Sequence, residues 1–504
     1  MTNATSPIVH HATENPDSIA VREGDRHFTY RELHEHLSGA AEEYRRRGIE
    51  RGDKIMLVLP TSAEFVFAYH GALSQGIVAV TVNPLCTPRE LTYFAQDAGC
   101  RLVVSWEPIG GPARQVASEL GLDVWELNDG AITAAKTLIP VDVPDEEDAA
   151  ILYTSGTTGR PKGAVLTHGN FLACGRGYAQ ALRFSPNERT GTALPLFHVF
   201  GQGSVMGPTF TMGGSLSLLR AFDAIKLLEM AVRDDLTSMA GVPTMWNALL
   251  HADTEITQEQ LPHLDKVFSG GAALPLEVAK AFQQRFGAVV LDGYGLSETT
   301  GAATYNDLDA ERKEQSVGRA VPGGEVGIMD LDHQLLPPGE VGEVVVKAPF
   351  VMKGYWQRPE ATAESRVGEW FLTGDMGRMD ADGDLWIVDR KKDLIIRGGY
   401  NVYPREVEEQ LYSHPAIVEA AVVGVPDERL GEEVAAVVVP KEGESIDAQE
   451  LRAWLGERLS PYKVPRVYRI VGELPKGATG KILKRGIDRD ELVSEGVRPA
   501  RPEQ

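Results

Sequence analysis

The amino-acid sequence predicts an α/β fold, with a large N-terminal domain of βαβ-type layered sheets that includes a small β-rich subdomain, followed by a small α+β domain. Two observations carry this prediction. Short apolar segments alternate with longer amphipathic segments up to about residue 300, and near residue 390 this pattern gives way to a compact α+β pattern. Alternating strands and helices are typical of a largely parallel sheet that helices cover on both faces.

The alternation is clearest early in the chain. Residues 55–59 predict a strand, residues 62–74 a helix and residues 77–82 a second strand. This strand–helix–strand spacing is that of a βαβ unit, whose two strands are parallel. Further along, residues 318–350 combine short apolar runs with Pro-Gly turns, which predicts the β-rich subdomain.

The C-terminal domain is expected to begin near residue 392. After a strand at residues 385–388, the pattern predicts, in order, a helix at 404–412, strands at 418–423 and 434–439, a helix at 448–459 and a strand at 467–471. A unit of about 110 residues can fold alone. We therefore predict an N-terminal domain of residues 1–391 and a C-terminal domain of residues 392–504, with a disordered tail from Ser494.

Composition excludes several classes of function. The 504 residues include 50 Lys and Arg against 72 Asp and Glu, a net charge of −22. This charge repels polyphosphate and argues against a general binder of nucleic acid or anionic membranes, but it allows a nucleotide in a local pocket. Three widely spaced cysteines, Cys86, Cys100 and Cys174, are typical of reduced thiols in the cytoplasm. No apolar run reaches the roughly 18 residues of a membrane helix, and the polar start predicts no secretory signal.

The strongest local signal is the run Tyr-Thr-Ser-Gly-Thr-Thr-Gly-Arg-Pro-Lys-Gly at residues 153–163. Glycines let backbone N–H groups approach a polyphosphate, hydroxyl groups donate further hydrogen bonds, and Lys162 supplies charge. A flexible surface turn is the alternative, although turns seldom combine these residue types so densely. The run is not a Walker A loop, because Lys162 follows a proline and precedes Gly163.

Further motifs follow in order along the chain. They lie at residues 194–198, 269–275, 293–299, 371–375, 388–392, 397–401 and 475–481. Together with residues 153–163, they resemble the signatures of the adenylate-forming superfamily of acyl-CoA synthetases, peptide-synthetase adenylation domains and beetle luciferase. The resemblance covers about residues 25–490, nearly the whole chain, and is greatest to a fatty acyl-CoA or acyl-carrier-protein ligase.

This resemblance implies a hinged enzyme with a reaction in two steps. In such relatives, a large N-terminal domain is joined by a hinge, here Lys392, to a small α+β C-terminal lid. A carboxylate attacks the α-phosphate of ATP, which gives acyl-AMP and pyrophosphate. The lid then rotates, and a thiol takes the acyl group from AMP. ATP, Mg²⁺ and coenzyme A, or the phosphopantetheine of a carrier protein, are therefore expected.

The resemblance also assigns site residues by position. The expected catalytic residues are Lys481, His198 and Lys162. The ATP and AMP site would comprise Thr154, Ser155, Gly156, Thr157, Thr158, Gly271, Ala272, Ala273, Asp292, Gly293, Tyr294, Ser297, Asp375, Arg390 and Lys481. The acyl pocket would comprise His198, Val199, Val242, Gly271, Gly293 and Gly295, the thiol channel Gly398, Gly399 and Tyr400, and the metal site Thr154 and Glu298.

Taken without the resemblance, several of these residues have plainer interpretations. Glu298 is compatible with an ordinary solvated acid, His198 with a satisfied core histidine and Tyr294 with core packing. Lys481 would be merely a lysine in a glycine-containing loop. Because these residues lie in the matching motifs, the resemblance favours a role in the site for each of them.

The acid itself is predicted from apolar residues near the histidine motif. No acidic residue stands there to hold an amino group, and no arginine lies in residues 197–219 to hold a second carboxylate. Glycines are expected to leave an open tunnel, at Gly201, Gly203, Gly207, Gly213 and Gly214. We expect a medium- to long-chain fatty acid, with an aryl acid of the cinnamate or coumarate type as the alternative.

Two other classes of function stay open. One is a luciferase-like oxidase, and the other is a non-catalytic sensor of acyl groups or nucleotides, which would be expected to have lost Lys481 or Glu298. The expected partners are a small carboxylic acid and CoA, with an acyl-carrier protein as an alternative acceptor. We expect no nucleic acid and no integral membrane segment, and a cytoplasmic monomer or homodimer.

Overall fold

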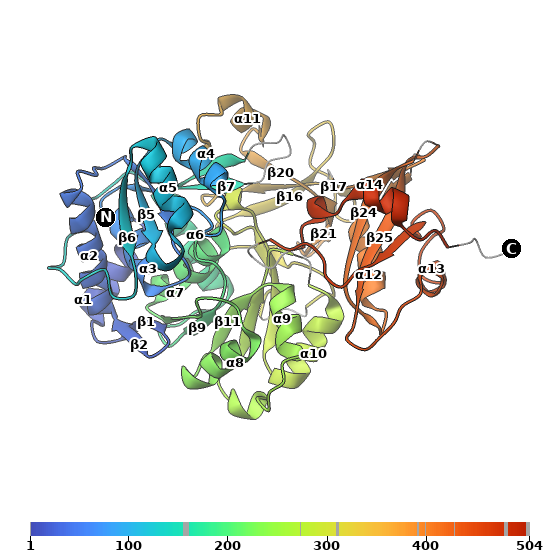
Figure 1. The fold of residues 1–504 in the computed structure, drawn as a ribbon, viewed down its shortest axis with the longest axis horizontal. Coiled ribbons are helices and arrows are strands. Elements are labelled where there is room, and N and C mark those ends of the chain that lie inside the picture. The colour runs from blue at the N-terminus through green and yellow to red at the C-terminus, as the bar shows by residue number, and fades with distance from the viewer. Residues whose placement is uncertain are drawn as a thin grey trace. The chain divides into compact units, whose positions relative to one another are not determined.

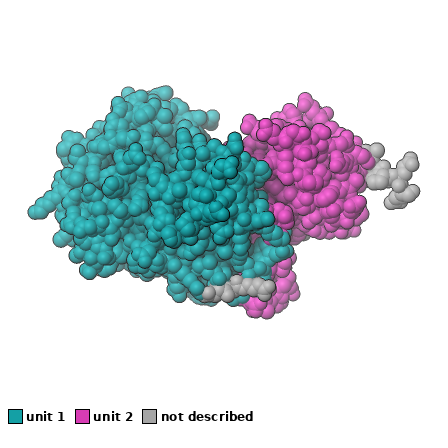
Figure 2. All heavy atoms as spheres, turned by 90° about the horizontal axis from the view of Figure 1, so that it is seen from below, with its two compact units in different colours: residues 1–274, 278–326, 345–372 teal, residues 275–277, 327–344, 373–504 magenta. Residues whose placement is uncertain are grey.

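The computed structural model describes residues 2–154, 161–272, 274–308, 312–390, 393–398, 400–427, 429–477 and 482–499. The chain forms two compact units (Figure 2). Unit 1 comprises residues 1–274, 278–326 and 345–372, and unit 2 comprises residues 275–277, 327–344 and 373–504. From residue 373 onward the chain belongs wholly to unit 2. The predicted boundary between residues 391 and 392 lies further along the chain and stays a prediction. The predicted mixed α/β class, with layered sheets and a small C-terminal domain, is confirmed.

Unit 1 contains a seven-stranded sheet. Its strands, in spatial order, are β18 (Gly354–Tyr355), β8 (Lys162–Thr167), β7 (Asp148–Thr154), β4 (Val78–Thr81), β3 (Lys54–Val58), β5 (Cys100–Trp106) and β6 (Asp123–Leu127). The five strands from β7 to β6 are parallel to one another. Alternation along β3 directs Ile55 and Leu57 into one apolar core and Met56 and Val58 into another. Both faces of this sheet are therefore covered, as predicted.

Unit 1 also contains a nine-stranded sheet. Its strands, in spatial order, are β15 (Arg319–Ala320), β14 (Thr304–Tyr305), β13 (Val289–Tyr294), β12 (Lys266–Ser269), β11 (Ser238–Gly241), β9 (Arg189–Thr192), β10 (Ser215–Leu218), β1 (Ile19–Glu23) and β2 (Arg26–Thr29). The run from β13 to β1 is parallel. Parallel neighbours place their carboxyl ends at one edge, which positions the loops that follow them.

Helices cover these sheets (Figure 1). They are α1 (Ser6–Glu14), α2 (Tyr30–Arg46), α3 (Ala63–Ser74), α4 (Pro88–Ala98), α5 (Gly111–Leu120), α6 (His168–Ala181), α7 (Gly207–Met212), α8 (Ala224–Arg233), α9 (Pro243–Leu250), α10 (Leu276–Phe286) and α11 (Pro359–Glu364). Helix α3 begins where the Ser62 side chain accepts the Phe65 N–H, and every residue of it is buried. It contacts β4 of one sheet and β1 of the other, which explains its apolar character on all sides. Among the described helices, none is long and apolar enough to cross a membrane.

The remaining strands form two five-stranded sheets. One has β16 (Glu325–Met329), β17 (Val341–Lys347), β20 (Trp370–Met379) and β19 (Arg366–Val367), with β21 (Leu385–Arg390) paired to β20. The other has β23 (Tyr400–Val402), β22 (Ile395–Arg397), β25 (Gly431–Pro440) and β24 (Ile417–Asp427), with β26 (Val467–Ile470) paired to β25. Helices α12 (Pro404–Tyr412), α13 (Ala448–Gly456) and α14 (Arg489–Glu495) complete unit 2.

The C-terminal tail differs from the prediction over residues 494–499. Helix α14 includes Ser494, and the backbones of Val497 and Tyr468 exchange two hydrogen bonds of 2.8 and 2.9 Å. The Asp488 side chain caps the N-terminus of this helix, and the side chain of Leu492 within the helix is fully buried. One buried leucine and a cap thus order a segment whose polar composition alone indicates disorder.

Candidate active site

Four parallel strands of the nine-stranded sheet end beside residues of the predicted site. Strand β9 leads to His198, β11 to Val242, β12 to Gly271, and β13 ends at Tyr294. These strands are adjacent in the order β13, β12, β11, β9, so their carboxyl ends share one edge. Ligands of open α/β sheets bind at such edges. The structure thus brings together four positions that are spread over almost a hundred residues of sequence.

The seven-stranded sheet contributes a hydroxyl–carboxylate cluster. Thr154 ends β7 and lies opposite Lys162, which begins β8. Its Oγ1 donates to Oε1 of Glu298 at 3.3 Å, and the Tyr355 hydroxyl donates to the same oxygen at 3.0 Å. Glu298 lies in the short helix η4 (Ser297–Thr299) and is 8% exposed. Both predicted metal residues therefore meet, together with a tyrosine that sequence reasoning missed.

Tyr355 also contacts the predicted phosphate lysine. The Nζ of Lys162 lies 5.2 Å from the centroid of the Tyr355 ring, within the range of a cation–π interaction. Burial, with a further contribution from the Glu298 carboxylate, raises the pKa of Tyr355 well above its ordinary value, so the phenol stays protonated and donates. Two sequence-distant elements, β18 and β8, bring these side chains together by pairing Tyr355 with Ala164.

His198 is half-buried at the end of the loop that follows β9. Its Nδ1 accepts the backbone N–H of Phe200 at 3.3 Å. Because Nδ1 accepts here, the neutral ring carries its proton on Nε2. The neighbouring residues Val199 and Val242, predicted for the acyl pocket, are both buried.

The glycines of the predicted acyl pocket are not alike. A Cβ on Gly271, which has φ +77°, would lie 3.6 Å from Cγ1 of Val242, an ordinary contact. A Cβ on Gly293 would overlap the Tyr305 ring, and one on Gly295 would overlap the Gly301 backbone. Close packing alone therefore accounts for glycine at positions 293 and 295, and their place in the acyl pocket stays a prediction.

The predicted glycine tunnel is wrong. A Cβ on Gly201 would lie 2.9 Å from the Pro195 carbonyl oxygen, and one on Gly203 would overlap the Thr300 carbonyl oxygen. A Cβ on Gly213 would overlap the His11 ring and one on Gly214 the Glu188 carbonyl oxygen, whereas one on Gly207 would make ordinary contact with Gly175 at 3.4 Å. At Gly201, Gly203 and Gly214 the missing side chain lets another backbone approach, and none of the five glycines faces open space.

The remaining described positions lie as follows. In unit 1, Asp292 is buried on β13, where its Oδ1 accepts the Gly293 N–H at 3.2 Å, and Ala272 follows Gly271. In unit 2, Asp375 is buried on β20 in register with Arg390 of β21. Several predicted positions lie outside the described residues, namely Ser155, Gly156, Thr157, Thr158, Ala273, Lys392, Gly399 and Lys481.

The predicted thiol channel lies in unit 2. Gly398 stands at a turn after β22 with φ +58°, and its N–H donates to the Leu430 carbonyl at 2.8 Å. Tyr400 begins β23, is 62% exposed, and its ring centroid lies 5.0 Å from that of Tyr462. Tyr400 is thus exposed and packs beside the partly buried Tyr462, and the thiol channel stays a prediction.

Family comparisons match nearly all of the chain. The AMP-binding enzyme family matches residues 8–356, and the AMP-binding enzyme C-terminal domain matches residues 406–481. The long-chain-fatty-acid–CoA ligase of Bacillus subtilis (strain 168) is 35% identical, over 97% of this chain and 94% of that protein. A feruloyl-CoA synthase of Amycolatopsis sp is 37% identical, over 95% of this chain and 97% of that protein.

Solved structures agree with the sequence comparisons. ATP-bound MatB from Rhodopseudomonas palustris has a TM-score of 0.89 at 33% identity, over 96% of this chain and 98% of that one. The o-succinylbenzoate CoA synthetase MenE from Bacillus subtilis, in complex with its acyl-adenylate OSB-AMP, has a TM-score of 0.85 at 30% identity, over 95% of this chain and 97% of that one. Both solved structures therefore share the fold of this chain.

Proposed function

The chain belongs to the AMP-binding enzyme family and is an ATP-dependent, AMP-forming acid–CoA ligase, and from this premise we propose that its acid has an apolar body without a second charge. One observation carries this proposal. The loop and helices after β9 hold no arginine and no acidic residue over residues 197–219, and Val199 and Val242, predicted for the acyl pocket, are both buried. A second carboxylate or an amino group on the substrate would have no charged partner there, at a cost of roughly several kcal/mol.

Two kinds of apolar acid satisfy this condition. A fatty acid of medium to long chain is the first candidate, and the fatty-acid ligase of Bacillus subtilis is a relative of this chain. An aryl acid is the second, favoured by the filled space beside Gly201 and Gly203, which leaves no tunnel there. Release of pyrophosphate with octanoate, palmitate, cinnamate, ferulate and malonate tests the proposal. Turnover of malonate above that of the apolar acids would overturn it.

The first step requires neutralisation of charge rather than a general base. A carboxylic acid with a pKa of about 4 to 5 is already ionised at neutral pH. In the proposed site, Lys162 would bind the departing phosphates and Lys481 the α-phosphate, while His198 would border the acid through its Nε2 proton. The acid oxygen bonds to the α-phosphorus and pyrophosphate leaves. The negative charge that grows on the leaving pyrophosphate would then be next to Lys162.

The proposed metal site contains hard oxygen donors. The Glu298 carboxylate and the hydroxyl of Thr154 are of the kind that Mg²⁺ prefers. The ion would supply positive charge to the phosphates when bound. The Tyr355 hydroxyl would hold the carboxylate in place from the side.

The remaining assignments place ribose and thiol in unit 2. Asp375 would accept hydrogen bonds from both ribose hydroxyls, and Arg390 would donate a hydrogen bond to the same sugar. The two residues are in register on β20 and β21. Gly398 and Gly399 would line the path of the thiol, because glycine allows a pantetheine arm to pass close to the backbone. Lys392 would be the hinge.

The acceptor is tested separately from the acid. With CoA present, formation of acyl-CoA should follow pyrophosphate release, whereas release without CoA turnover would indicate a carrier protein. We also propose a cytoplasmic location, which the three free thiols of Cys86, Cys100 and Cys174 support.

A further inference from the structure

The loop that carries His198 is fixed by side chains from other elements. It leaves β9 and enters the π-helix η2 (Phe200–Met206). Loop carbonyls without helix or sheet partners need donors from elsewhere when they are buried. Three buried polar side chains, Thr61, Thr81 and Gln202, supply them.

Thr81 is the last residue of β4, in the middle of the seven-stranded sheet, and is 4% exposed. Its Oγ1 donates to the carbonyl oxygen of Phe197 at 2.8 Å. Phe197 directly precedes His198, so this bond fixes the peptide that joins the two residues. A rigid sheet strand therefore sets the position from which the histidine side chain departs.

Gln202 extends this contact into a chain. Its Nε2 donates to Thr81 Oγ1 at 2.9 Å and to the Leu196 carbonyl oxygen at 3.0 Å. Since Leu196 offers an acceptor, the amide must present its NH₂ there, which settles its orientation. Successive bonds from Gln202 to Thr81 to Phe197 polarise one another. A π-helix is rare and concentrates at functional sites, and here it carries the glutamine.

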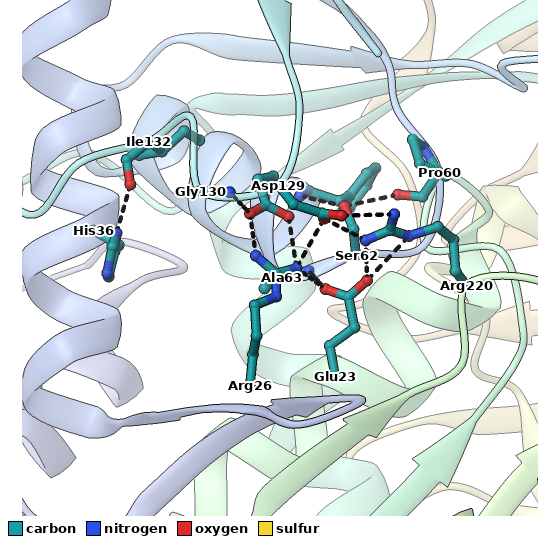
Figure 3. Close-up of polar contacts among 12 residues, drawn as sticks. Glu23, Arg26, His36, Pro60, Ser62, Ala63, Asp129, Gly130, Ile132 and Arg220 are labelled. Atoms are coloured by element: carbon teal, nitrogen blue, oxygen red, sulfur yellow. Dashed lines mark hydrogen bonds and ion pairs between the residues drawn. The ribbon is translucent and has the colours of Figure 1, made fainter. Parts of the chain in front are cut away.

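Thr61 holds the start of the same loop. Its Oγ1 donates to the Leu194 carbonyl oxygen at 2.9 Å and accepts the Leu196 N–H at 3.2 Å. The chain just after Thr61 is itself anchored, because the Ala63 N–H donates to Oε2 of Glu23 at 3.0 Å. Figure 3 shows this anchor within a cluster of ion pairs.

Two arginines pair with the three carboxylates of this cluster. Arg26 donates to Glu64 at 2.6 Å and to Asp129 at 3.1 Å, and Arg220 donates to Glu23 at 3.0 Å (Figure 3). Through the Ala63 N–H, the cluster fixes the start of α3. Through Thr61, this rigidity reaches the loop before His198.

We propose that Thr81 and Gln202 are positioning residues for adenylation: they hold the Phe197 carbonyl, and with it the His198 ring, against the acid. This inference rests on the proposed function, in which His198 borders the acid. Neither residue is expected to contact ATP, so their loss should impair use of the acid and leave binding of ATP nearly unchanged. A displacement of about 1 Å can cost a hundredfold in rate.

The test compares Thr81→Val, which keeps the shape and removes the hydroxyl, with Thr81→Ser, which restores it. The matched control is Thr5→Val, because Thr5 is fully buried at the start of α1, outside the proposed site, and its Oγ1 donates to Oδ1 of Asn3 at 2.7 Å. We expect Thr81→Val to lower kcat/KM for the acid by about 10- to 100-fold, with the KM for ATP within about twofold. Thr81→Ser and Thr5→Val should stay within about threefold of the wild type.

A crystal structure of Thr81→Val provides a readout that does not depend on activity. The Phe197 carbonyl or the His198 ring should move by about 1 Å from its wild-type place. An unmoved loop, an equal rise in the KM for ATP, or an equal loss in Thr5→Val would overturn the inference. If the wild type releases no pyrophosphate with any acid, the proposed function fails, and the crystal structure alone decides whether Thr81 positions the loop.

Discussion

Replacement of Tyr355 by phenylalanine isolates the hydroxyl that meets the predicted metal residue. The change removes the 3.0 Å hydrogen bond to Glu298, whereas the aromatic ring that lies 5.2 Å from Lys162 is kept. Glu298 is buried and retains the 3.3 Å bond from Thr154. A hydrogen bond to a charged group contributes about 1.5 to 3 kcal/mol.

This free energy predicts a fall in kcat/KM for pyrophosphate release of about 10- to 100-fold, if the bond is fully used in the transition state. The Mg²⁺ concentration that gives half-maximal activity should rise, because Glu298, which we propose as the Mg²⁺ ligand, is held by one hydrogen bond fewer. The assay is pyrophosphate release at fixed ATP and acid over a series of Mg²⁺ concentrations.

The matched control is Tyr44→Phe. Tyr44 is fully buried in α2, and its hydroxyl donates to the Ala68 carbonyl at 3.0 Å, away from the site. It should lose stability without a change in the Mg²⁺ dependence. If Tyr355→Phe keeps wild-type kinetics at every Mg²⁺ concentration, or if the control shows the same rise, then the reasoning is refuted. In a protein that already carries Glu298→Gln, Tyr355→Phe should lower the activity little further, since both substitutions remove the same interaction.

The remaining predictions concern the half-reactions, acid stability and thiol reactivity. Lys481→Ala should abolish pyrophosphate release but keep thioester formation from supplied acyl-AMP, and Gly399→Leu should do the reverse; a common defective step would contradict catalysis in two poses. Burial lowers the pKa of His168 from 6.5 to about 4. Its folded pKa lies below its unfolded one, so its contribution to stability is present above pH 6.5 and is lost as the pH falls toward 4, about 2 kcal/mol by pH 5. Urea unfolding should show a smaller loss between pH 7.5 and 5 in His168→Asn, and equal losses would refute this assignment. Burial raises the pKa of Cys86 to about 11 and of Cys100 to about 12, so mass spectrometry should find native thiols slow to react with iodoacetamide at pH 7.5 and all three reactive in urea; rapid native labelling would argue against it.

The sequence alone was sufficient for the fold class and the reaction class. The βαβ period near residues 55–82 specifies parallel strands with buried faces, and helix α12 lies at Pro404–Tyr412 as the pattern predicts. Both depend on local periodicity, which a window of a dozen residues contains. The ordered motifs likewise indicate ATP-dependent ligation, because they record residue types at fixed spacing.

Only the tertiary structure decided which side chains meet. Tyr355 reaches Glu298 because β18 pairs with β8, and Thr81 reaches Phe197 because the end of β4 contacts the loop that follows β9. Nothing in the local sequence marks either contact. The glycines were misread for the same reason, since a glycine that opens a tunnel and one that admits a neighbouring backbone, as Gly203 does, look alike in sequence. Periodicity is a property of one segment, whereas contact depends on how distant segments pack.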